Sequence, residues 1–205
     1  MVAANKSIPS PAPTRERLVA AMLDALQRKG LHGIGLNELL ETAQAPKGVL
    51  YHHFPQGKAE LAVAAIEDAT ARVAVSLDAM LASHKEIVAS LRCWLGGAQK
   101  QLEGSHFERG CPLAAIALES GTEDAAIRAA LNQAFVTVRD RLGAGLRAAG
   151  LTPVRSRQVA ALLVAGYEGA LIQARVAGDT RPMGDITEAL VRLVQFELQQ
   201  AGTRP

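Results

Sequence analysis

The spacing of apolar residues along the chain is the feature that most limits its fold. Between residues 123 and 149, apolar or small residues recur every three or four positions, at Ile127, Leu131, Ala134, Val138, Leu142 and Gly145. This spacing places them in one stripe along an α-helix, which the helix can bury against a neighbour. No interval shows β-branched residues alternating with polar ones, so no strand is predicted. The pattern therefore predicts an all-α protein.

Glycine and proline residues divide the chain into separate helices, because both residue types tend to end a helix or begin one. The expected helices cover residues 14–29, 36–42, 46–52, 58 to about 82, 85–101, 112–119, 123–149, 156–177 and 185–200. Three short helices thus precede a larger bundle. We expect a flexible, proline-containing arm over residues 1–13, a three-helix domain over 14–57 and a larger helical domain over 58–205.

Charge and composition exclude several classes of protein. Residues 1–58 carry seven lysines and arginines against four acidic residues, whereas the remainder carries fifteen against sixteen. A basic head on a near-neutral body suits phosphate binding, although a solvated basic face would give the same balance. The two cysteines are too few for a disulfide framework. The N-terminus lacks a secretory signal, and the longest apolar run, 159–167, stops at Glu168, well short of a membrane span of ~20 residues. A soluble, cytoplasmic protein is expected.

Residues 35–61 carry most of the functional information. The first helix in this segment has one apolar face, made by Leu36, Leu39, Leu40 and Ala43. After a short turn, Pro46 stands where a second helix can begin, because its ring presets φ and its missing N–H would have no partner there. The second helix turns Leu50 inward, with Phe54 just beyond it, and leaves its polar residues outside. Two such helices, the second exposing a cation, a glycine and an aromatic hydroxyl, suit the major groove of DNA.

These residues resemble the helix-turn-helix of the TetR-type transcriptional regulators. The match centres on the run APKGVLYHHF at 45–54, followed by Gly57-Lys58 and Glu60-Leu61. In that family Lys-Gly-x-Leu-Tyr-x-x-Phe, then a loop and Lys-x-x-Leu, is the recurring pattern. The Ala-Pro-Lys-Gly variant and the run GCPLAA at 110–115 are similar to the branch described as LmrA/YxaF-like. The resemblance is strong over about residues 14–61 and rests elsewhere on helix order and that one short motif.

The resemblance implies DNA-binding roles for six residues, namely Lys47, Gly48, Val49, Tyr51, His52 and Lys58. Lys47 would pair with a phosphate or a guanine edge, and Gly48 would let the helix lie close to the DNA backbone. The Tyr51 hydroxyl would reach a phosphate, with a place in the core as the alternative for this ring. His52 would contact a phosphate or a base. Lys58 would meet a phosphate at the start of the long helix, where free N–H groups already favour anions.

Three positions depart from the family pattern. Pro46 stands where a capping serine is usual, and Val49 stands where threonine is frequent, so this position can touch a thymine methyl but cannot donate a hydrogen bond. Gln44 replaces a frequent glycine in the turn, which costs about 1 kcal/mol if this residue has positive φ. These changes affect the base code and leave the fold expectation intact.

By the same resemblance, the larger domain should bind a small apolar effector and form a homodimer. The helix over 156–177 carries small residues that would let a second helix approach closely, at Ala160, Ala161, Ala165, Gly166, Gly169, Ala170 and Ala174. Packing inside the protomer is the alternative. Together with 185–200 this helix would build a four-helix interface. The candidate effector-binding residues are Trp94, Phe107, Phe135 and Tyr167, each of which could equally be plain core.

An enzymatic function finds little support in the sequence. Glu103 and His106 have a spacing found in di-iron bundles, but such sites need a second copy of the pair, and Gly104 interrupts the helix between them. We expect no catalytic residue, metal or cofactor. Cys111, in a Gly-Cys-Pro sequence at a helix start, could be a redox-sensing thiol, but a buried packing role is the favoured interpretation.

The sequence as a whole predicts a ligand-responsive transcriptional regulator, and the family resemblance implies that this regulator is a repressor. Such a protein would bind palindromic double-stranded operator DNA as a homodimer and would be released by a small apolar effector. A helical small-molecule-binding protein of the same fold without DNA-binding function is the alternative, and the presence of Lys47, Tyr51 and Lys58 argues against it.

Overall fold

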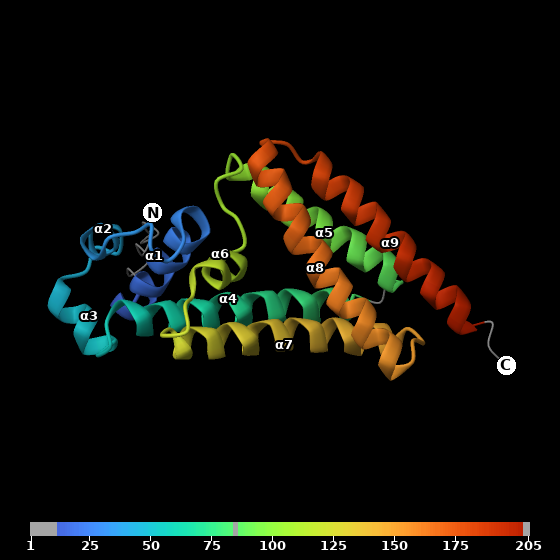
Figure 1. The fold of residues 1–205 in the computed structure, drawn as a ribbon, viewed down its shortest axis with the longest axis horizontal. Helices are drawn as coiled ribbons and strands as arrows, with labels where there is room; N and C mark the ends of the chain where they lie inside the picture. Colours follow the sequence, from blue (N-terminus) through green and yellow to red (C-terminus); the bar gives the residue numbers. More distant parts are fainter. Residues whose placement is uncertain (1–11, 84–85, 203–205) are drawn as a thin grey trace, which may run out of the picture.

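The computed structural model describes residues 12–83 and 86–202, and in these ranges the chain forms helices and no strand (Figure 1). The helices are α1 (Thr14–Lys29), α2 (Leu36–Thr42), α3 (Lys47–His53), α4 (Lys58–Leu81), α5 (Ile87–Gly104), α6 (Pro112–Glu119), α7 (Ala125–Ala148), α8 (Pro153–Ala177) and α9 (Arg181–Gly202). The predicted all-α fold is confirmed. Most of the arm expected over residues 1–13 lies outside the described residues.

The helices form a small head and a longer body. Helices α1 to α3 gather at one end, where α4 begins (Figure 1). From there α4 runs alongside α7, and α7 packs in turn on α8. Helix α9 lies against α8 and α5 at the opposite end of the molecule. Helix α4 is therefore a single rigid element that reaches from the head into the body.

The hydrophobic core of the head continues into the body. Leu18 of α1 and Leu50 of α3 are fully buried in one cluster with Ile116 of α6 and Leu131 of α7. A second cluster joins the far parts of α4 and α7 to α5, α8 and α9. The boundary predicted after residue 57 falls at Gly57, which caps α4, but apolar packing continues across it. Movement in the body can therefore reach the head through buried contacts.

Prolines explain the clearest differences from the predicted helix bounds. Helix α8 begins at Pro153 and not at residue 156, because Pro153 occupies the first helical turn and Thr152 Oγ1 accepts the N–H of Arg155 at 3.3 Å. Helix α9 begins at Arg181, so Pro182 and Gly184 lie in its first turn, where a missing N–H costs nothing. Helix α3 is shifted one residue, with Pro46 as its N-cap.

Candidate DNA interface and effector cavity

The turn between α2 and α3 is held rigidly against α1. Its central residue, Gln44, has φ of 49°, the left-handed conformation in which the family's frequent glycine would be unstrained. Arg17 of α1 donates from Nε to the carbonyl of Ala43 at 3.0 Å and from Nη2 to the carbonyl of Gln44 at 3.2 Å. Leu50 and Phe54 are buried beneath the turn, as predicted. The angle between α2 and α3 is thus fixed by side-chain bonds and by packing.

Helix α3 presents a polar face to solvent. Lys47, Gly48, Tyr51 and His52 are exposed, while Val49 is half-buried. A Cβ added to Gly48 would meet nothing within 4 Å, so space outside the helix is open at that point. The Tyr51 ring lies over Gly57, where an added Cβ would come within 3.2 Å of Tyr51 Cε1. The predicted DNA-binding residues of α3 therefore share one accessible surface.

Lys58, the sixth predicted DNA-binding residue, has an internal partner. Its Nζ donates to the backbone carbonyl of Ile34 at 2.7 Å, and burial lowers the pKa of its ammonium group. An ammonium has three donors, so two remain for a phosphate at the start of α4. Lys58 therefore also fastens the segment before α2 to α4, a structural role that the sequence did not indicate.

A cavity of about 580 Å³ lies between α1 of the head and α4, α5, α7 and α8. Three of the four predicted effector-binding aromatics, Trp94, Phe135 and Tyr167, line it. The ring centroids of Trp94 and Tyr167 are 5.8 Å apart, and Trp94 Nε1 donates to Ser76 Oγ at 2.9 Å. The remaining walls are mainly aliphatic, so the cavity has the composition of a small-molecule site.

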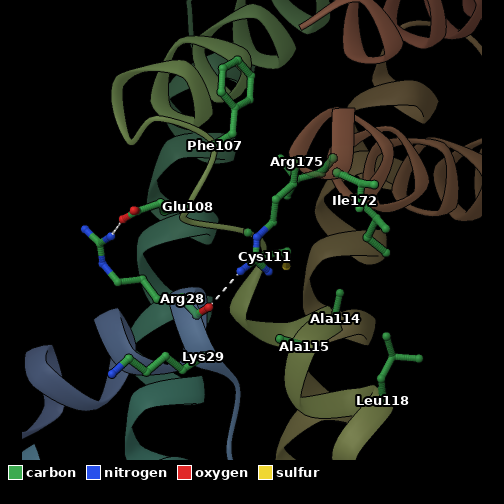
Figure 2. A pocket seen from close by; sticks show the side chains of 13 residues that line it. Arg28, Lys29, Phe107, Glu108, Cys111, Ala114, Ala115, Leu118, Ile172 and Arg175 are labelled. Atoms are coloured by element: carbon green, nitrogen blue, oxygen red, sulfur yellow. Dashed lines mark hydrogen bonds and ion pairs between the residues drawn. The ribbon is translucent and has the colours of Figure 1, made fainter. Parts of the chain in front are cut away.

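Phe107, the fourth predicted aromatic, lies elsewhere. It lines a neighbouring groove of about 710 Å³ between the end of α1, α6 and the end of α8 (Figure 2). Phe107 has φ of 62° and follows His106 at 55°, so two consecutive residues of the α5–α6 loop are left-handed, a conformation that helix periodicity could not predict. The groove and the cavity adjoin, since Cys111 and Leu171 line both.

The cavity also contains polar groups that the sequence did not point to. Glu168 of α8 faces it, and the thiol of Cys111 donates to Glu168 Oε1 at 3.1 Å. Burial raises the pKa of both the Glu168 carboxyl and the Cys111 thiol. Cys111 is therefore a protonated thiol, which fits the favoured packing role and opposes that of a redox sensor. The one sequence signal for Glu168 is that a lone carboxylate ends the most apolar run of its helix.

Hydrogen bonds join the walls of the cavity and of the adjoining groove to the second half of α1. The Gly110 N–H donates to the carbonyl of Gln27 at 3.0 Å, and Arg175 Nη2 donates to the carbonyl of Arg28 at 2.8 Å (Figure 2). Arg109 Nε also reaches Asp24 Oδ1 at 2.8 Å. The final carbonyls of a helix have no partner within the helix, so these donors satisfy groups that would otherwise need water. The α5–α6 loop and α8 are thereby bound to the head.

Two family profiles cover most of the chain. Residues 18–65 match "Bacterial regulatory proteins, tetR family", and residues 88–189 match "Transcriptional regulator LmrA/YxaF-like, C-terminal domain". The HTH-type transcriptional regulator Rv0196 of Mycobacterium tuberculosis is 29% identical over 191 residues, which cover 91% of this chain and 96% of the relative. The HTH-type transcriptional regulator LmrA of Bacillus subtilis is 24% identical, with 89% and 97% covered.

Solved structures agree with this assignment. The regulatory protein TetR from Rhodobacter sphaeroides is 30% identical, with a TM-score of 0.79 over 87% of this chain and 97% of that protein. A TetR transcriptional regulator from Legionella pneumophila, only 18% identical, shares the fold with a TM-score of 0.82 over 89% and 97%. Proteins of this kind bind DNA and act as dimers. The chain belongs to the TetR family of bacterial transcriptional regulators and carries the LmrA/YxaF-like form of the C-terminal domain.

Proposed function

We propose that this protein is an effector-controlled repressor that binds a palindromic operator as a homodimer and leaves it when a small, largely apolar molecule enters the cavity. One observation carries the proposal: the cavity is walled partly by the head itself. Leu23 and Gln27 of α1 line it, as do Ala69 and Val73 of α4. A molecule in the cavity would contact both helices that set the position of α3.

An exposed stripe over residues 161–176 of α8 supports dimerisation. It consists of apolar and small residues mostly three or four positions apart, namely the exposed Ala161, Leu162, Ala165, Ile172 and Val176 with the half-buried Gly169. Of the small residues noted in the sequence, Ala160, Ala170 and Ala174 face the protomer interior. Gly166 faces Leu190 of α9, whose side chain would lie 3.0 Å from a Cβ added to this glycine. A partner's α8 and α9 would cover the exposed stripe.

The same stripe accounts for a resemblance of α8 to a membrane helix. Among the described helices, α8 alone is long and apolar enough to cross a membrane, and only a third of its most apolar window is buried within the protomer. An interface between subunits explains this partial burial, because it would remove the apolar face from water. We therefore assign the helix to a dimer in the cytoplasm.

Binding to DNA would use the exposed face of α3. Lys47 can pair with a phosphate or a guanine edge, Tyr51 and His52 can donate to phosphates, and the half-buried Val49 can touch a thymine methyl. Two copies of α3 related by a twofold axis would read half-sites one helical turn apart, about 34–36 Å, or a multiple of that spacing.

Effector and operator would oppose each other through the position of the head. Swinging α4 changes the separation of the two α3 helices, and only one separation fits both half-sites. A 10- to 100-fold loss of operator affinity requires only ~1.4–2.8 kcal/mol of coupling per dimer. The hydrogen bonds from the α5–α6 loop and α8 to α1 give the cavity a second connection to the head.

Selection from random duplex DNA tests the proposed function. The purified protein should enrich a sequence with dyad symmetry and with half-sites at the predicted spacing, and a Lys47→Ala variant should bind this site at least tenfold more weakly. Exposed Lys100 of α5, far from α3 in sequence and structure, provides the matched control in Lys100→Ala. Failure to enrich any duplex would favour the alternative, a small-molecule-binding protein without DNA-binding function.

A further inference from the structure

We propose that the cavity selects a lipophilic amine, an apolar molecule with one ammonium group, and that Glu168 is the residue that receives this group. The inference rests on the proposed function in taking the cavity as the effector site. It adds the chemical class of the effector and the residue that distinguishes this class from other apolar molecules.

The Glu168 carboxylate has an unused acceptor inside the protein. Its Oε1 accepts a hydrogen bond from the Cys111 thiol, whereas its Oε2 is buried and has no hydrogen-bond partner among the described residues. A buried polar atom without a partner has lost its hydrogen bonds to water without replacement, and the cost in free energy is greater when the atom is charged. Buried charges in proteins are normally paired. A ligand that brings a donor to Oε2 would recover this cost on binding.

Among the described residues, the walls of the cavity offer Glu168 no cation without a partner. Two arginines line the cavity, and each donates a hydrogen bond to an aspartate: Arg72 Nε to Asp68 of the same helix at 2.7 Å, and Arg109 Nε to Asp24 of α1 at 2.8 Å. The other polar groups at the cavity, such as Gln27 and Gln101, are uncharged. The described walls thus leave the Glu168 charge unbalanced, and an ammonium would balance it.

Two aromatic rings line the cavity together with this carboxylate. Tyr167 precedes Glu168 on α8, and Trp94 of α5 lies with its ring centroid 5.8 Å from that of Tyr167. Faces of aromatic rings attract cations, most strongly where water is excluded. Both rings line the same cavity, whose volume lies within the range for drug-sized ligands. A carboxylate and aromatic rings in one cavity would distinguish an ammonium from an alcohol or a carboxylate of the same size.

Affinity for an amine should depend on pH through Glu168. Burial raises the pKa of this carboxyl, and only its deprotonated form balances an ammonium. The affinity for the amine should therefore increase as the pH rises through the pKa of Glu168, and it should be low at pH values below that pKa. The titratable neighbours do not reverse this sign: burial raises the pKa of both Cys111 and Tyr167, so both stay neutral, and Arg72 and Arg109 are each hydrogen-bonded to an aspartate.

Three probes that share one carbon skeleton test the proposal: 4-phenylbutylamine, 4-phenylbutanol and 4-phenylbutyrate. Binding to the full-length protein is measured by calorimetry and by the fluorescence of Trp94, the single tryptophan of the chain. We expect the amine to bind at least tenfold more tightly than the alcohol, and the carboxylate to bind most weakly. Equal affinity for amine and alcohol, or tightest binding of the carboxylate, would overturn the proposal.

A variant identifies the responsible residue. Glu168→Gln should weaken amine binding at least tenfold and change alcohol binding less than threefold, and it should abolish the pH dependence. Glu103→Gln, the same change at an exposed position of α5, should alter neither. If Glu168→Gln does not fold, the pH dependence in the unmodified protein decides, because amine affinity that does not rise with pH contradicts the proposal.

Release from the selected operator separates this inference from the proposed function. If the alcohol binds as tightly as the amine and displaces the protein from DNA, the repressor function stands and the role of Glu168 is wrong. If the amine binds through Glu168 without changing operator affinity, the ligand class stands and the proposed control of DNA binding is wrong.

Discussion

The hydrogen bond from Arg175 to α1 should carry part of the coupling between effector and operator. Arg175 follows Glu168 and Leu171 along α8, and both of these residues line the cavity. Its Nη2 donates to the Arg28 carbonyl at 2.8 Å, in the last turn of the first helix of the head. A change in α8 caused by an occupied cavity would therefore act directly on α1.

The strength of this bond sets the expected effect. Hydrogen bonds that involve a charged group contribute about 1.5–3 kcal/mol, and the half-buried Arg175 falls at the lower end because solvent screens it. A contact of about 1.5 kcal/mol that is made in only one of two states shifts their equilibrium about tenfold. Arg175→Gln removes the guanidinium, so the factor by which the effector weakens operator binding should change by up to about tenfold.

Fluorescence anisotropy of a labelled operator, with and without saturating effector, measures that factor. Arg139→Gln, the same change at an exposed position of α7, is the matched control. The salt dependence of operator binding should stay the same in both variants, because neither change removes a contact to phosphate. If Arg175→Gln and Arg139→Gln give the same coupling factor as the unmodified protein, the connection through Arg175 does not transmit the effect.

Three further predictions concern individual residues. Gln44→Gly should stabilise the protein by about 0.5–1 kcal/mol, because it relieves a positive φ; melting at fixed protein concentration should then rise by roughly 1–4 °C. Lys58→Ala should weaken binding to all DNA sequences and reduce the slope of log affinity against log salt concentration by about one, which filter binding across a salt series would measure. An unchanged slope would mean that Lys58 contacts no phosphate and only bonds to the Ile34 carbonyl. Because burial raises the pKa of the Cys111 thiol, iodoacetamide at pH 8 should modify Cys111 much more slowly than the exposed Cys93, as peptide mass spectrometry would measure. Faster modification of Cys111 would restore the redox-sensor interpretation.

The sequence predicted the fold and which side of α3 is exposed, because both depend on local patterns. The bounds of α1, α2 and α6 follow directly from apolar periodicity and from glycine or proline at the ends. Leu50 and Phe54 are buried, and Lys47 and Tyr51 are exposed, because helix geometry alone decides which side each occupies.

The cavity was predicted only in part because it depends on contacts between distant segments. Trp94, Phe135 and Tyr167 come from three helices and meet through tertiary packing, while the left-handed loop conformation directs Phe107 into the neighbouring groove. Glu168 and Arg175 gain their roles from Cys111 and from the end of α1, which lie far away in the sequence. A local sequence pattern cannot predict contacts between residues so far apart in the chain.

Titrating one effector into the free dimer and into the operator-bound dimer tests the account most directly. The compound would be an apolar molecule that raises the melting temperature of the protein, and the operator would be the duplex obtained by selection. Because coupling between two sites is reciprocal, operator DNA should weaken effector binding by the same factor by which the effector weakens operator binding. We predict a factor of 10 to 100, about 1.4–2.8 kcal/mol. Equal effector affinity in the two forms, with the cavity occupied, would contradict the claim that this cavity controls DNA binding.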